Sequence, residues 1–136
     1  MEVDYEDIEI PYRRSEGEDP LGEALNEWEK AKDAWVTVAL EAAKKEASLK
    51  AWEASQKKAL IMGEKKSAVL AESILRSEPM YKGADQEFKG MTEWEYRFIT
   101  TQRASIDAED KKRSMVIAQS RWETERTREA TLRHVR

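Results

Sequence analysis

The feature that most constrains the fold is a stretch of nearly sixty residues, 19–77, that is almost free of helix-breaking residues. It has no proline after Pro20, and its glycines are Gly22 and Gly63. Asp19 followed by proline is a favourable helix start, because an Asp side chain can accept hydrogen bonds from the free amides of a first turn and proline fits the first helical position.

The apolar residues of this stretch recur at alternating spacings of three and four, which places them on one face of a helix. They are Leu21, Leu25, Trp28, Trp35, Ala39, Ala42, Leu49, Leu60, Leu70 and Ile74. We therefore expect one long helix over residues 20–78. Glycine in a helix interior costs about 1 kcal/mol relative to alanine, so Gly63 is the position at which this helix would bend.

A reversal and a second long helix follow. Residues 79–91 contain one proline and two glycines, which predicts a loop. Thr92 and Glu95 have the spacing of a capping box, in which each side chain bonds the backbone amide of the other residue. No glycine or proline occurs after Thr92, so the second helix is expected over residues 92–136.

The predicted architecture is all-α: a long antiparallel helical hairpin, similar to a coiled coil, that completes its core by self-association into a bundle. Charged residues make up 38% of the chain, which leaves little apolar material for an enclosed core. Symmetric homo-oligomers, dimers above all, are the common solution for such incomplete cores.

Residues 1–19 are expected to form an acidic, flexible arm. Residues 1–20 contain eight acidic and two basic side chains. Apolar residues recur at every second position in two clusters, which is the spacing of a strand: Val3 and Tyr5, then Ile8, Ile10 and Tyr12. The arm could therefore become extended against a partner or a second copy of the chain.

Several classes of function are disfavoured by composition. The chain has no cysteine and a single histidine, His134, so neither a thiolate zinc site nor a His-based catalytic triad is expected. We expect no catalytic, cofactor-binding or metal-binding residues, and no enzyme. An acidic start without an apolar run and the lack of any window of about 18–20 apolar residues predict a cytoplasmic protein with no membrane contact.

The tryptophans are the strongest candidates for interface residues, because indole rings are costly to expose and enriched in interface anchors. Either they line the core between helices and symmetry mates, or one or two, with Trp52 first, anchor another protein. The expected partner or oligomer interface consists of Trp28, Trp35, Leu49, Trp52, Trp94 and Trp122. This pattern favours a non-enzymatic assembly, adaptor or scaffolding module that binds other proteins.

The basic end of the second helix supports an alternative function, accessory nucleic-acid binding. Cations would contact phosphates, and Trp122 would offer a stacking surface for a base. The possible phosphate contacts are Lys111, Lys112, Arg113, Arg121, Arg126 and Arg128. Three glutamates interrupt this series, so a solvated helix face explains it better than nucleic-acid binding does. The opposite charges of the two ends also raise the hypothesis that the acidic arm covers this basic face.

Overall fold

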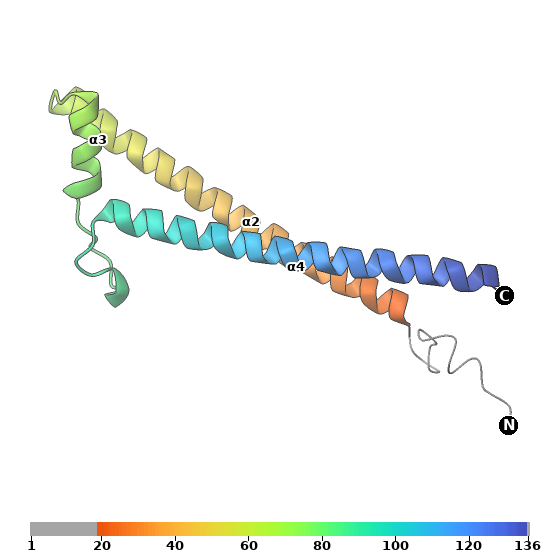
Figure 1. Cartoon of the computed structure of the whole chain (residues 1–136). Helices are drawn as coiled ribbons and strands as arrows, with labels where there is room; N and C mark the ends of the chain where they lie inside the picture. The colour runs from red at the N-terminus through yellow and green to blue at the C-terminus, as the bar shows by residue number, and fades with distance from the viewer. Residues whose placement is uncertain (1–18, 136) are drawn as a thin grey trace. The chain divides into compact units, whose positions relative to one another are not determined.

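A computed structural model describes residues 19–135 of the chain, and most of the predicted acidic arm lies outside these residues. Helices account for 85% of the described residues, and no strand occurs among them, which confirms the all-α prediction. The elements shown in Figure 1 are α2 (Pro20–Lys58), a π-helical turn (Ala59–Gly63), α3 (Ala68–Ser77), a 3₁₀ turn (Gln86–Phe88) and α4 (Glu93–Val135).

Helix α2 begins where the capping chemistry predicts. The Asp19 carboxylate accepts a hydrogen bond of 3.1 Å from the amide of Gly22, and its carbonyl accepts one of 2.9 Å from the amide of Glu23. A Cβ at position 22 would collide with the Asp19 carboxylate. Glycine at this position therefore leaves room for the cap.

The single helix expected over residues 20–78 is corrected by the structure, which divides it. The α-helix ends at Lys58. The next five residues form a wider π-helical turn that ends at Gly63. The chain then leaves the helix through Lys65, which has a positive φ of 56°. A residue in this left-handed conformation ends helices in the same way that a terminal glycine does.

A second capping residue explains why the helix restarts as α3. The Ser67 hydroxyl accepts a hydrogen bond of 3.2 Å from the amide of Leu70, which satisfies one of the free donors of the new first turn. The bend expected at Gly63 is thus a full break of the helix.

The start of α4 agrees with the prediction for the second helix. The Thr92 hydroxyl accepts a hydrogen bond of 3.1 Å from the amide of Glu95. Before this cap, Tyr81 donates a backbone hydrogen bond of 3.0 Å to the carbonyl of Met91, which closes the loop. Gly90, at a φ of 86°, supplies the left-handed conformation that this closure needs.

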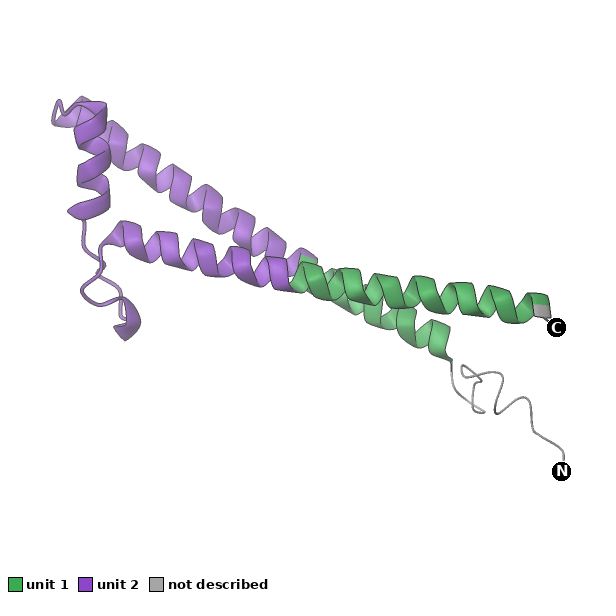
Figure 2. Ribbon diagram, in the orientation of Figure 1, with its two compact units in different colours: residues 1–35, 111–136 green, residues 36–110 purple. Residues whose placement is uncertain are grey.

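The chain divides into two compact units, coloured separately in Figure 2. Among the described residues, the first unit contains 19–35 and 111–135, and the second contains 36–110. The first unit buries Ala24 and Ala118, and the second buries Ala42, Ala71, Leu75 and Phe88. Four of these six buried residues are alanines, so the described residues enclose little apolar volume.

The second unit has the only large aliphatic side chain that is fully buried in the described part of the chain. Leu75 on α3 is 1% exposed, and Ala71, one turn earlier, is completely buried. An ion pair of 3.6 Å between Lys57 and Glu72 joins the end of α2 to the same helix. The packing of α3 therefore depends on Leu75 more than on any other single side chain.

We predict that Leu75→Ala lowers the free energy of unfolding by about 2–5 kcal/mol, because it removes buried methyl groups and leaves a cavity. Ser73→Ala on the same helix is the matched control, since Ser73 is exposed and is not one of the apolar side chains. It should change stability by less than about 0.5 kcal/mol. Urea denaturation followed by circular dichroism measures both, and equal effects would contradict the packing described for α3.

Candidate interaction surfaces

Two stacked tryptophans connect α2 and α4 within the first unit. The ring centroids of Trp28 and Trp122 lie 4.9 Å apart, and the ring planes are inclined by 27°. A cationic side chain also lies over each indole: Lys32 is 5.4 Å from the Trp28 ring, and Arg126 is 4.7 Å from the Trp122 ring. Stacking and cation contacts of this kind are each worth roughly 0.5–1.5 kcal/mol beyond the buried area.

An ion pair reinforces the same contact. The Arg121 guanidinium lies 2.9 Å from the carboxylate of Glu27, one residue before Trp28 on α2. Both side chains are more than half exposed, so screening by water limits this pair to a small contribution. Trp28 and Trp122, predicted as interface residues, are thus brought together by the fold.

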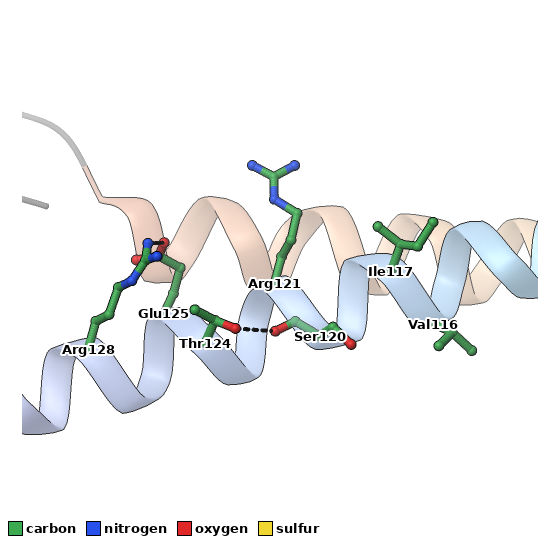
Figure 3. Close-up of a pocket in the computed structure, with 7 residues that line it drawn as sticks. All are labelled: Val116, Ile117, Ser120, Arg121, Thr124, Glu125 and Arg128. Atoms are coloured by element: carbon green, nitrogen blue, oxygen red, sulfur yellow. Dashed lines mark hydrogen bonds and ion pairs between the residues drawn. The ribbon is translucent and has the colours of Figure 1, made fainter. Parts of the chain in front are cut away.

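A shallow groove of about 450 Å³ runs along one side of α4 in the first unit (Figure 3). It is lined by Val116, Ile117, Ser120, Arg121, Thr124, Glu125 and Arg128. The side chains of Val116 and Ile117 are 48% and 63% exposed, so one end of the groove is apolar. Seven lining residues from one helix form an elongated surface, which suits contact with another helix better than enclosure of a small molecule.

The predicted phosphate contacts do not form one row of unengaged cations. Arg121 pairs with Glu27, Arg126 lies over Trp122, and Arg128 donates a hydrogen bond of 2.8 Å to Glu125. Arg113 also has an interaction within the chain. Lys111 and Lys112 are exposed.

In the second unit, two further tryptophans are covered by arginines. Arg97 lies 5.2 Å from the Trp52 ring, and Arg76 lies 4.8 Å from the Trp94 ring. Trp94 also stacks on Phe98, with ring centroids 4.9 Å apart and an angle of 14° between the planes. Arg97 and Arg76 therefore help to hold the Trp52 and Trp94 rings in place. The sequence did not identify either arginine as a partner of a tryptophan.

The two remaining predicted interface residues make weaker contacts. Leu49 is half-buried and lines a second groove, of about 270 Å³, together with Phe98. Trp35 is half-buried, and within residues 19–135 it has neither a ring partner nor a cation over its ring. The indole nitrogens of Trp28 and Trp94 are buried, and they have no hydrogen-bond partner among the described residues.

An aromatic cluster that the sequence did not predict packs the loop against the start of α4. The Phe88 ring, only 3% exposed, lies 5.7 Å from Tyr81 and 4.8 Å from Tyr96. Arg103 covers Phe88 at 5.5 Å and pairs with the carboxylate of Glu87. In the sequence, the indication of this cluster was that one aromatic residue, Tyr81, precedes Gly83 and another, Phe88, follows it.

No protein-family model matches the chain, and comparison with curated proteins and with solved structures gave no match. Within residues 19–135, no helix combines the length and the apolar character needed to cross a membrane. In the same residues, no three His, Cys, Asp or Glu side chains lie together as ligands for a metal ion.

The stacked indoles give a spectroscopic prediction. Two indoles at 4.9 Å should couple and produce an exciton couplet in the far-ultraviolet circular dichroism spectrum. Trp28→Phe and Trp122→Phe should each abolish the couplet. Trp52→Phe is the control and should retain it, because Trp52 has an arginine rather than a second indole over its ring. A couplet that persists in both of the first two variants would contradict the stack.

The Glu87–Arg103 pair gives a prediction about pH. The hydrogen bond from the Arg103 guanidinium, assisted by its charge, holds the pKa of Glu87 below the ordinary value of a glutamate. A lowered pKa in the folded state means that the unfolded chain binds the proton more readily. The contribution of this pair is therefore complete above the unfolded pKa and is lost as the pH falls through the folded pKa.

The measurement is an NMR titration of the side-chain carboxyl carbons. Glu87 should titrate below the ordinary pKa of a glutamate, and Arg103→Gln should return its pKa to the ordinary range. Arg97→Gln is the matched control, because Arg97 pairs with Glu93 and not with Glu87. An unchanged titration of Glu87 in the Arg103 variant would exclude the pair.

Proposed function

We propose that this protein is a non-enzymatic assembly or adaptor module. In this proposal, α2 and α4 form a long antiparallel hairpin, similar to a coiled coil, and two or more chains associate into a bundle. The helical surface of the assembly then binds another protein. We further propose that the protein acts in the cytoplasm and without membrane contact.

The observation that carries the proposal is the mismatch between what the described residues bury and what they expose. Their buried set is six residues, four of which are alanines. Their exposed large apolar side chains are Val36, Leu40, Ile61, Met62, Val69, Leu70, Met80, Phe98, Ile106, Val116 and Ile117. Single exposed apolar residues are normal on a soluble protein, but here they outnumber the buried ones.

Association would convert this exposed area into a core. Burying a leucine, isoleucine or valine side chain contributes roughly 1.5–3 kcal/mol, whereas an alanine adds little more than one methyl group. Leu40 and Ile106, both 58% exposed, lie on α2 and α4 of the second unit and are available for such burial. A second chain that covers them would supply stabilisation that one chain does not obtain from its own alanines.

The tryptophans have a different role in this proposal. Arg97 over Trp52, Arg76 over Trp94 and the stack of Trp28 on Trp122 each join two helices within one unit. The cations over Trp28 and Trp122 come from the same helix, one turn away. The exposed aliphatic residues then make the contacts between chains. Trp52 remains the candidate anchor for a different protein.

Accessory nucleic-acid binding is the alternative function. The exposed Lys111 and Lys112 support it. Because Arg121, Arg126 and Arg128 have partners within their own unit, phosphate binding would have to compete with those contacts. Fluorescence anisotropy with labelled oligonucleotides distinguishes the two functions, since phosphate contacts must weaken steeply between about 50 and 200 mM salt.

Sedimentation equilibrium tests the assembly directly. We expect the native chain to have a mass above that of one chain, and Val36→Glu combined with Leu40→Glu to shift it towards the monomer, because association would bury both charges. Both side chains are exposed, so the helix content should stay unchanged.

Lys44→Glu, an exposed position one turn beyond Leu40, is the control for the added negative charge. It should leave the mass unaltered. A native chain that is monomeric at every concentration would contradict self-association.

A further inference from the structure

The corner between α2 and α3, residues 57–70, combines an apolar surface with a concentration of lysines. Helix α3 lies against the π-helical turn, so the apolar side chains of both elements belong to one region of the second unit. Ile61 and Met62 in the turn are 37% and 72% exposed. Val69 and Leu70 in the first turn of α3 are 83% and 47% exposed.

The charge of the corner is positive. It contains Lys57, Lys58, Lys65 and Lys66 against one acid, Glu64. Lys57 pairs with Glu72, whereas no ion pair is found for the other three lysines within residues 19–135. The corner therefore combines positive charge with exposed apolar side chains, which would suit a partner that is both apolar and acidic.

We propose that the corner binds residues 1–10 of a second copy of this chain. That segment contains five acidic side chains and no basic one. Its apolar side chains, Val3, Tyr5, Ile8 and Ile10, fall at strand-like spacing within two pairs. The segment thus complements the corner in charge and in apolar character, and an extended peptide can present alternate side chains to a surface.

The length of α2 determines that the segment comes from another chain. From Pro20 to Lys58 the helix rises by roughly 57 Å, at about 1.5 Å per residue. Residues 11–19 can span at most roughly 30 Å when fully extended, at about 3.3–3.6 Å per residue. Residue 10 therefore falls roughly 25 Å short of the corner of its own chain, and Asp4, fifteen residues before Asp19, also falls short of it with roughly 50–54 Å of extended chain. The segment as a whole can bind only the corner of another chain, and the inference rests on the self-association proposed above.

The basic end of α4 is the other surface that an acidic segment could cover. Three of its cations, Arg121, Arg126 and Arg128, are already engaged with a carboxylate or an indole of the first unit. Lys58 and Lys65 in the corner are exposed and lack such partners among the described residues. The corner is thus the better match for the acidic segment.

Disulfide trapping tests the contact in the full chain, which contains no natural cysteine. A chain with Asp4→Cys and a differently tagged chain with Lys66→Cys are mixed and oxidised gently. We expect a cross-linked species that contains one copy of each, and we expect its loss at high salt because the contact depends on charge. Lys30→Cys, at an exposed position on α2, is the matched control and should give no cross-link.

Two further variants sharpen the result. Adding Met62→Glu and Val69→Glu to the Lys66→Cys chain should abolish the cross-link, because both substitutions place acids where the acidic segment would bind. A single chain that carries both Asp4→Cys and Lys66→Cys should form the disulfide between chains and not within one chain.

The outcomes separate this inference from the proposed function. A native chain that is an oligomer but gives no Asp4–Lys66 cross-link, or cross-links equally at position 30, overturns the inference alone. A chain that is monomeric at every concentration overturns both. Binding to vesicles of anionic lipid that Met62→Glu and Val69→Glu abolish, without any cross-link, would assign the corner to a membrane surface and also overturn the inference.

Discussion

The structure depends on how little apolar surface each of the two units buries. Among the described residues, Ala24 and Ala118 are the buried residues of the first unit, and Ala42 is the one that α2 buries in the second. Alanine permits close approach of helix backbones, but it contributes a small apolar volume. Specificity must then come from larger side chains at the edges of the contact, and the covered tryptophans supply it. The stack of Trp28 on Trp122 joins segments that are 94 residues apart in the sequence.

Helix starts were predictable because their chemistry is local. Asp19 and Thr92 each bond an amide three residues further along, so the sequence alone identifies them. The break after Gly63 was only partly predictable. Its cause is a π-helical turn followed by Lys65 in a left-handed conformation, and lysine has no intrinsic preference for that conformation.

The candidate surfaces show the same division between local and distant information. The tryptophans could be identified by residue type, but Arg97 over Trp52 and Arg121 beside Glu27 are pairings across distant segments that no spacing rule reveals. Several arginines that look like one basic face in the sequence are consequently tied to carboxylates or rings. The series of basic residues can be recognised in the sequence. The carboxylates and aromatic rings that contact these residues are seen only in the structure.

These features lead to one physical account of the molecule. Local caps and cation-covered indoles define the helices and hold segments together, while large aliphatic side chains such as Leu40 and Ile117 stay exposed. We propose that a chain built in this way gains more from a second copy than from further contacts within itself. In the proposed account, association therefore adds to the stability of a chain whose helices already form.

The most direct measurement is the midpoint of thermal unfolding as a function of protein concentration. If folding is coupled to association, mass action requires the midpoint to rise as the concentration rises. A midpoint that stays constant over a wide concentration range would show that one chain is a complete folding unit, and it would contradict the account.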